Sequence, residues 1–284
     1  ELPLFNATAY IKTGSIYEPA GKTGLASLTG QVMRSGGTTQ RPGDTLDEEL
    51  AFIAGSVEVS IGQSSATASV SMLTKHIDTG LEIFADVLMN PAFPQDKVEL
   101  AKKRAIARIR RQNDHPGSIS FREFMKQVYG PDSPWGRSST IETVGTVSRE
   151  DMAAFHAQYF HPNNTLLAIA GDFKTDELIA KIRKVFQNWE KTTVDFPELP
   201  AFGNGPRPGV YHIEKDVNQS AIYIGHFGIN DLNPDWYAVR VMNRIFGVGT
   251  FTSRMGKEVR VNRGLAYSVG GAVTRSAAQG IFYL

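Results

Sequence analysis

The sequence predicts an α+β fold made of two related domains, and three observations lead to this class. Val, Ile, Ser and Thr alternate over residues 56–61 and 66–73 around a short polar segment, a period of two that is typical of a β-hairpin. Residues 77–89 instead repeat apolar side chains at helical spacing. The order strand, helix, helix, strand, strand over residues 4–74 occurs again after residue 220, which indicates an internal duplication.

The first domain is expected to open with a strand and a short glycine-ended helix. Leu25, Leu28 and Val32 share one helix face, and two glycines follow at 36 and 37. A later helix starts at Ser148, where Asp151 completes a capping box. The expected elements are strand 4–13, helix 24–36, helix 45–54, the hairpin, helices 77–89, 94–112, 121–128 and 148–160, a buried strand 165–170 and helix 176–189.

A change of composition separates the two predicted domains. Residues 190–209 hold four prolines and three glycines, which is typical of a linker. After the linker we expect strand 220–227, helices 235–246 and 251–263, and strands 265–274 and 279–284. The prediction is therefore a first domain at 1–189, a linker at 190–209 and the first half of a second domain at 210–284. Because this second copy lacks the later elements of the first, we expect the chain to be part of a longer protein.

Composition excludes several classes of protein. The formal net charge is +1, from 30 basic and 29 acidic residues, so the chain lacks the basic surplus of a nucleic-acid binder. No cysteine is present, which excludes thiolate metal sites, disulfides and cysteine nucleophiles. No apolar run approaches the roughly 20 residues of a membrane span. The expected partners are therefore neither nucleic acid nor the membrane interior.

Two stretches resemble the pitrilysin or insulinase-like metallopeptidases, the inverzincins. One is the Gly-Ser-x-Tyr-Glu-Pro-x-Gly turn at 14–21 with the Thr-Gly-Leu-Ala that follows it. The other runs over 150–172 as Glu-Asp-Met-x-x-Phe-x-x-x-Tyr-Phe-His-Pro-Asn-Asn-x-x-Leu-x-x-x-Gly-Asp. The resemblance implies two homologous domains, each an antiparallel sheet with helices on one face, the second incomplete in this chain.

The same resemblance locates a metal site that this chain has lost. Family members carry His-x-x-Glu-His on the first helix, two zinc ligands and a general base. The matching positions here are Ser27, Gly30 and Gln31, and the third ligand, a glutamate, falls within 106–109, where no carboxylate occurs. We therefore expect no metal site and no cofactor in this chain, with zinc held by a partner subunit.

The second candidate site consists of Arg260 and Tyr267. From the residues alone, Arg260 complements the C-terminus of its helix and Tyr267 packs in a sheet. The resemblance implies another role, since family members use an arginine and a tyrosine at this spacing to bind the substrate backbone. A guanidinium fork and a phenol hydroxyl are suitable donors to peptide carbonyls. Arg260 and Tyr267 are therefore the predicted substrate-binding residues, and none is predicted to be catalytic.

The functional prediction combines two observations. The first helix lacks the metal ligands, whereas the arginine–tyrosine pair has the spacing found in the family. We expect a zinc-less subunit that forms a heterodimer with a homologous zinc-binding peptidase subunit and has endopeptidase activity only in that complex. Two alternatives stay open: a stand-alone peptide-binding or scaffold protein, and an active zinc metallopeptidase with atypical ligands. Similar chains imply a bacterial periplasmic location, while cytoplasmic and mitochondrial locations stay open.

Overall fold

The computed structural model describes residues 3–202, 205–276 and 279–284. Contacts divide it into two compact units: one runs up to Arg110 and resumes over Ser139–Leu199, and the other comprises Arg111–Ser138 and Pro200–Leu284. The short 3-10 helices are η1 (Ser15–Tyr17), η2 (Ala20–Lys22), η3 (Thr74–His76) and η4 (Pro162–Asn164). No helix in the described ranges combines the length and apolar character that crossing a bilayer needs.

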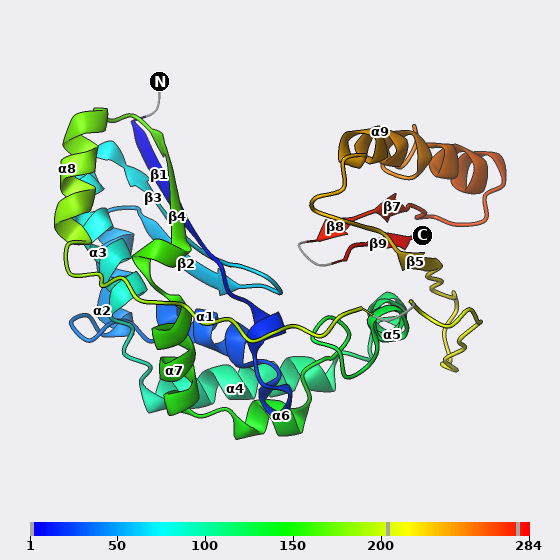
Figure 1. Cartoon of the computed structure of the whole chain (residues 1–284), viewed down its shortest axis with the longest axis horizontal. Helices are drawn as coiled ribbons and strands as arrows, with labels where there is room; N and C mark the ends of the chain where they lie inside the picture. Colours follow the sequence, from blue (N-terminus) through cyan, green and yellow to red (C-terminus); the bar gives the residue numbers. More distant parts are fainter. Residues whose placement is uncertain (1–2, 203–204, 277–278) are drawn as a thin grey trace. The chain divides into compact units, whose positions relative to one another are not determined.

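The first unit is an antiparallel sheet with helices on one face (Figure 1). Its strands lie in the order β2-β3-β1-β4, and the pairs β1·β3, β1·β4 and β2·β3 are all antiparallel. The strands are β1 (Leu4–Ile11), β2 (Ser56–Ile61), β3 (Ala66–Leu73) and β4 (Thr165–Gly171). The helices are α1 (Leu25–Ser35), α2 (Gly43–Phe52), α3 (Ile77–Met89), α4 (Gln95–Arg110), α6 (Ile141–Thr146), α7 (Arg149–Tyr159) and α8 (Thr175–Val185).

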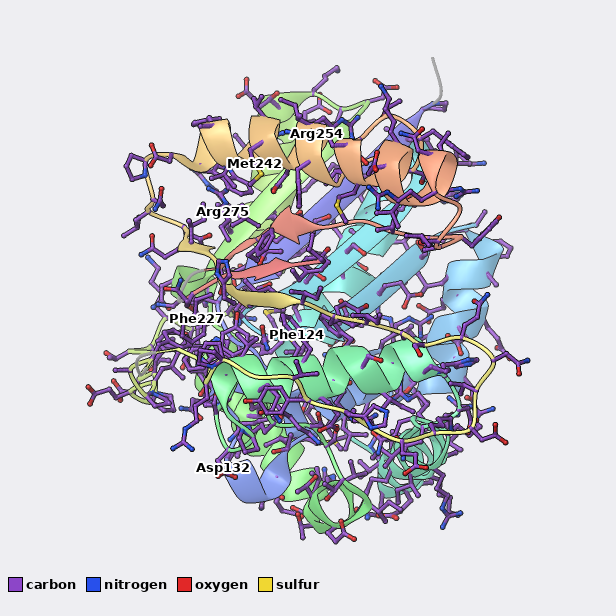
Figure 2. All side chains as sticks on the ribbon, turned by 90° about the vertical axis from the view of Figure 1, so that its right-hand side faces the viewer. Phe124, Asp132, Phe227, Met242, Arg254 and Arg275 are labelled. Atoms are coloured by element: carbon purple, nitrogen blue, oxygen red, sulfur yellow. The ribbon has the colours of Figure 1, made fainter. Side chains whose placement is uncertain are left out.

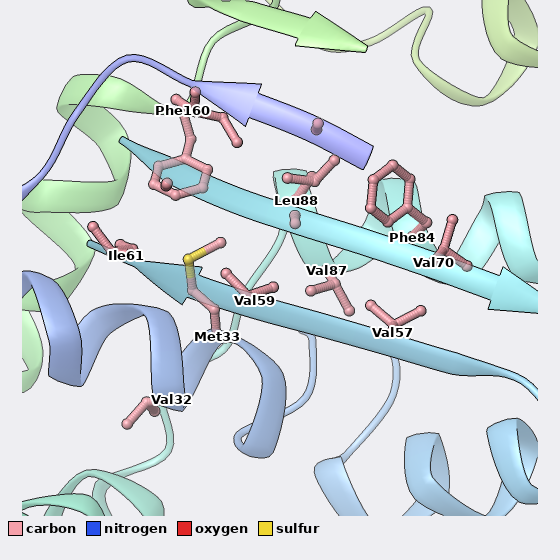
Figure 3. Packing of buried hydrophobic residues seen from close by; sticks show 14 of the residues in the cluster. Val32, Met33, Val57, Val59, Ile61, Val70, Phe84, Val87, Leu88 and Phe160 are labelled. Carbon is pink, nitrogen blue, oxygen red and sulfur yellow. The ribbon is translucent and has the colours of Figure 1, made fainter. Parts of the chain in front are cut away.

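Strict alternation of side chains builds the core of this unit. Along β2 the valines and the isoleucine are buried while Ser56, Glu58 and Ser60 are exposed, as the period of two requires. Figure 3 shows the buried side of the sheet against helix residues such as Met33 and Phe84. The α+β class and the 56–61/66–73 hairpin predicted from the sequence are confirmed.

Strand β4 differs from its prediction. The sequence predicted a buried strand, yet β4 lies at the edge of the sheet and Leu166 is 63% exposed. A short apolar run has the same sequence pattern whether both faces of the strand are covered or only one. Here Leu167 and Ile169 pack against the core, whereas Leu166, Ala168 and Ala170 lie on the uncovered face.

The second unit combines one long helix from the middle of the chain with the C-terminal elements. Phe121 and Phe124 of α5 (Pro116–Tyr129) contact Tyr223, with ring centroids 5.4 and 5.8 Å away, and the Tyr129 hydroxyl donates to the carbonyl of Gln279 at 2.6 Å. Figure 2 shows Phe124 on α5 and Phe227 on the neighbouring strand. The other elements are β5 (Gly225–Phe227), β6 (Ile229–Asn230), α9 (Trp236–Phe246), the π-helix η5 (Gly256–Asn262), β7 (Ala272–Val273), β8 (Arg275–Ser276) and β9 (Ile281–Tyr283).

The strands of this unit are shorter than predicted. The expected strand 220–227 is present only as β5, and the expected strand 265–274 only as β7. A strand needs a neighbour along its whole length, and β5 pairs with three residues of β9, extended by one reciprocal bond pair between Ile224 and Leu284. The sheet β5-β9-β7 is antiparallel, as expected, while the two-residue pair β6·β8 is parallel.

The two compact units do not coincide with the predicted domain boundaries. The boundary near residue 199 falls within the predicted linker 190–209, which carries no helix or strand in its described part. Residues 111–138, however, pack in the second unit although the prediction counted them within 1–189. The predicted domains at 1–189 and 210–284 were derived from a repeated order of elements. Contacts do not test that duplication, so these domains stay a prediction.

Candidate functional site

The N-terminus of α1 is held by a buried carboxylate. Glu18 is 4% exposed, and its two oxygens accept the backbone N–H groups of Gly24 at 2.8 Å and Ala26 at 2.9 Å. A negative charge at this end of a helix is favourable because it satisfies free N–H groups and opposes the helix dipole. Gly24 has a φ of +110°, a conformation that favours glycine, which lets the chain turn from Glu18 into the helix.

Helices α6 and α7 fix the turn that precedes α1. The hydroxyl of Thr143 donates to the carbonyl of Thr23 at 2.8 Å, and the ammonium of Lys22 forms an ion pair with Asp151. Burial alone would raise the pKa of Asp151, but hydrogen bonds from Lys22 and from Ser148 outweigh it and hold that pKa below its ordinary value. These contacts tie the turn before α1 to α6 and α7.

The three positions that match the family's metal motif lie on α1, where two of them face away from the core. Ser27 is exposed, Gln31 is half-buried and Gly30 is buried. A hydroxyl and a neutral amide are poor zinc ligands compared with imidazole, thiolate or carboxylate. The residues present therefore do not fit a zinc ion.

Close packing at Gly30 leaves no room for a general base. A Cβ atom at this position would lie 2.9 Å from Cγ1 and 3.0 Å from the backbone nitrogen of Ile61 on β2. The Nε of Arg34, one turn further on, donates to the carbonyl of Val57 at 2.6 Å and ties the helix to the same strand. Any side chain at residue 30 would have to displace Ile61 or separate α1 from β2.

The structure offers no replacement ligand set in its described ranges. They contain no group of three or more His, Cys, Asp or Glu side chains that could hold a metal ion. The stretch 106–109 on α4, where the third ligand was sought, carries Arg108 as an exposed cation. His156 and His161 bond backbone carbonyls instead: their Nε2 atoms lie 2.8 Å from the oxygen of Leu88 and 2.7 Å from that of Ala157.

His156 is held neutral by its surroundings. Burial lowers its pKa from 6.5 to about 4, and the nearby His161 adds to this, while the bond to Leu88 opposes it. Its ring stacks on Phe160 with centroids 4.9 Å apart, and Phe93 approaches edge-on. We assign His156 a packing role in the interface between α7 and the end of α3.

In the second unit, the structure brings Arg260 and Tyr267 together. The guanidinium carbon of Arg260 lies 4.5 Å from the centroid of the Tyr267 ring and also 4.5 Å from the centroid of the Phe251 ring. Cation–π contacts of this kind are worth about 0.5–1 kcal/mol at exposed sites. Tyr267 is 82% exposed and Phe251 61% exposed, so this arginine–aromatic cluster of Phe251, Arg260 and Tyr267 lies at the surface of the unit.

Hydrogen bonds of two buried polar side chains hold the backbone near this cluster. Ser253 is fully buried; its hydroxyl donates to the carbonyl of Gly249 at 2.7 Å and accepts the N–H of Gly256 at 3.1 Å. The Asn243 amide of α9 exchanges two 2.8 Å hydrogen bonds with the backbone of Val273 on β7. The loop carrying Phe251 and the π-helix carrying Arg260 are therefore joined by defined contacts.

Two family profiles match the chain. Residues 6–133 match the profile described as Insulinase (Peptidase family M16), and residues 146–284 match Peptidase M16 inactive domain. The chain belongs to the M16 insulinase-like peptidase family. It is peptidase-like, and in this M16 chain the positions of the metal motif hold Ser27, Gly30 and Gln31.

Curated relatives of this M16 chain are similar over almost its whole length. A Rickettsia bellii protein named uncharacterized zinc protease is 27% identical over 99% of this chain and 68% of its own length. A Helicobacter pylori protein named non-peptidase homolog YmxG is 25% identical over 94% of this chain and 62% of its own length. The chain thus spans about two thirds of the length of these relatives.

Solved structures share the fold. A peptidase M16 inactive domain from Pseudomonas fluorescens superimposes with a TM-score of 0.92 at 26% identity, covering 100% of this chain and 68% of that one. The periplasmic protease PqqL from Escherichia coli gives a TM-score of 0.74 at 17% identity over 31% of its own chain, a likeness in fold alone.

Two features of the site escaped the sequence analysis. Phe251 precedes Arg260 by nine residues and no periodic pattern joins them, because the contact depends on the turn at residues 249–253. The close contact between Gly30 and Ile61 joins residues from two separate elements. A glycine inside an amphipathic helix was the one local signal for that contact.

Proposed function

We propose that this M16 chain is a non-catalytic subunit that pairs with a homologous zinc-bearing subunit and contributes Arg260 and Tyr267 to peptide binding. The observation that carries the proposal is the contrast between the two sites. Gly30 packs so closely on Ile61 that a general base has no room, whereas Arg260 and Tyr267 lie together at an exposed surface.

The chemistry proposed for the pair is hydrogen bonding to the peptide backbone. A guanidinium and a phenol hydroxyl are both hydrogen-bond donors, the first in a planar fork and the second as a single O–H. Donors directed at a carbonyl oxygen stabilise the charge that develops on it during hydrolysis, while the metal and its water would belong to the partner subunit. The heterodimer, the zinc in the partner and the peptide substrate are all parts of this proposal.

The names of relatives bear on the proposal in both directions. The Helicobacter pylori relative is named a non-peptidase homolog, which supports an inactive chain. The Rickettsia bellii relative is named an uncharacterized zinc protease, which keeps an active zinc enzyme with atypical ligands as a second alternative. The poor ligands Ser27 and Gln31 weigh against that alternative.

A stand-alone peptide-binding protein is the other candidate, and the edge strand β4 favours it. Beyond β4 no further strand of the described residues is paired, so its outer N–H and C=O groups are available to an extended peptide. This binding mode would need neither a zinc subunit nor Arg260.

The test mixes the chain with a homologous M16 subunit that carries His-x-x-Glu-His. We expect neither hydrolysis of a quenched fluorescent peptide nor stoichiometric zinc, by mass spectrometry, with the chain alone. The mixture should cleave, and Arg260→Gln or Tyr267→Phe should lower its kcat/KM about 10-fold or more. Arg240→Gln, which removes one exposed charge of the same unit, is the matched control.

Two outcomes separate the alternatives. Stoichiometric zinc and hydrolysis by the chain alone would overturn the proposal in favour of an active enzyme. Tight peptide binding with no effect of the partner or of Arg260→Gln would favour the scaffold. A bacterial periplasmic location belongs to the same proposal and is checked by cell fractionation.

A further inference from the structure

The guanidinium of Arg260 lies against two aromatic rings of its own unit. The rings of Phe251 and Tyr267 each lie over it, with centroids 4.5 Å from its central carbon. A guanidinium carries five N–H donors, which lie in its plane, and it accepts no hydrogen bond. The two rings therefore contact Arg260, while its donors bind no acceptor in the described part of the chain.

Arg260 has no anionic partner in the described part of the chain. Its side chain makes no hydrogen bond and no ion pair there, unlike Arg263, whose Nε donates to Glu258 at 2.6 Å. Glu258 also accepts from Asn262 at 3.1 Å. Hydrogen bonds from Arg263 and Asn262 lower the pKa of Glu258, so this carboxylate is ionised and already engaged.

The segment around the cluster carries a clear excess of positive charge. Residues 251–267 contain four cations, Arg254, Lys257, Arg260 and Arg263, against the single acid Glu258, a net charge of +3. Figure 2 shows Arg254 on the helical segment of this unit. The whole chain has a net charge of only +1, so this segment is far more positive than the chain as a whole.

We propose that the arginine–aromatic cluster binds a carboxylate of the peptide, from an acidic side chain or from the peptide's C-terminus. A planar fork with free donors matches the two oxygens of a carboxylate, and paired N–H···O⁻ bonds are among the strongest in proteins. The other ionisable residues of 251–267 add a net charge of +2, which attracts an anionic peptide and repels a basic one. The inference rests on the proposed peptide-binding function and adds to it the charge class of the ligand.

Phe251 is then a positioning residue for this interaction. Its ring centroid lies 4.5 Å from the guanidinium carbon, while the bonds of the buried Ser253 define the turn from which the ring extends. Replacing Phe251 by leucine keeps an apolar side chain but removes the flat partner. The guanidinium would then rotate more freely and lose more entropy on binding a carboxylate.

The test compares three dansyl-labelled peptides of one neutral scaffold, titrated into the 284-residue chain at fixed ionic strength. The first carries two aspartates and a C-terminal amide, the second has no acid but a free C-terminus, and the third has no acid and an amide. We expect the first, the second or both to bind about 10-fold tighter than the third. The first two distinguish a side-chain carboxylate from a terminal one.

Three variants connect the preference to the cluster. Arg260→Gln should bring the affinity ratio of anionic to neutral peptide close to one, and Phe251→Leu should lower that ratio while far-UV circular dichroism and Tm are unchanged. Arg240→Gln removes the same charge from α9, where Arg240 is exposed and engages no side chain of the described residues, and should leave most of the ratio intact.

The outcomes separate this inference from the function on which it rests. Equal binding of all three peptides, or an equal loss of preference in Arg240→Gln and Arg260→Gln, would overturn the carboxylate assignment and leave peptide binding in place. If none of the peptides binds, alone or with the zinc-bearing partner, both the inference and the proposed function are wrong.

Discussion

The Glu18 carboxylate accepts the backbone N–H of Ala26 at 2.9 Å inside the protein, and through this bond it caps the helix whose family counterpart carries the metal motif. The chain has thus kept the support of that helix while its ligand positions hold Ser27, Gly30 and Gln31. Support and chemistry are separate properties of the helix, and each can be tested.

Glu18→Ala should destabilise the first unit by about 2–4 kcal/mol, because two N–H groups lose a charged acceptor in a buried setting. Urea unfolding followed by far-UV circular dichroism measures the change. Glu48→Gln on the exposed side of α2 is the control and should change stability by less than about 0.5 kcal/mol. A loss at Glu18 no larger than this control would show that the cap contributes little.

Gly30→Ala should destabilise the protein although alanine is the better helix former by about 1 kcal/mol. The new Cβ would stand 2.9 Å from the Ile61 side chain, and overpacking of this kind costs about 1–3 kcal/mol. Gly145→Ala, where a Cβ meets nothing within 4 Å, should instead be neutral or stabilising. Thermal unfolding compares the two, and a stabilising Gly30→Ala would refute the close-packing argument.

His156 should make the fold less stable as the pH falls. Its pKa is about 4 in the folded protein and 6.5 otherwise, so between these values the unfolded chain binds a proton that the folded protein does not. Its contribution is complete above pH 6.5 and lost on acidification to pH 4, up to about 3 kcal/mol. Denaturant unfolding from pH 7.5 to 4 should show a shallower slope for His156→Gln, and an unchanged slope for exposed His115→Gln.

Tyr129→Phe should loosen the packing of α5 within the second unit. The phenol donates to the carbonyl of Gln279 at 2.6 Å, and burial raises the pKa of Tyr129 to about 12, so it stays a donor throughout the usable pH range. The loss should be about 1–2 kcal/mol, visible as faster amide exchange over 116–129. Tyr211→Phe, which removes a bond in an exposed loop, should leave that exchange unchanged.

Local patterns predicted the elements of the first unit well because each pattern there has a physical cause within a few residues. The hairpin follows from alternation along β2 and β3, and the start of α7 from the reciprocal bonds of Ser148 and Asp151. The exposure of β4 could not be predicted, since it depends on which strand lies beside it. The short strands β5 and β7 have the same cause, because their lengths depend on partners elsewhere in the chain.

The candidate site was predictable only in part. The positions Ser27, Gly30 and Gln31 came from a motif match, and the spacing of Arg260 and Tyr267 came from the same resemblance. The contact of Arg260 with both Phe251 and Tyr267 depends on how the turn, the π-helix and the following segment fold together. Sequence therefore identified the pair, whereas the contact of Phe251 with Arg260 required the structure.

Strand β4 has a practical consequence for anyone who handles this chain. Its sequence, Thr-Leu-Leu-Ala-Ile-Ala-Gly, contains no charge and no proline, and it forms the end of the described sheet. Native proteins usually protect such edges with lysine, proline or a bulge, because an unprotected edge recruits other strands. Concentrated stocks of the 284-residue chain should thus become turbid before dilute ones do. Ala168→Lys should delay the onset of that turbidity.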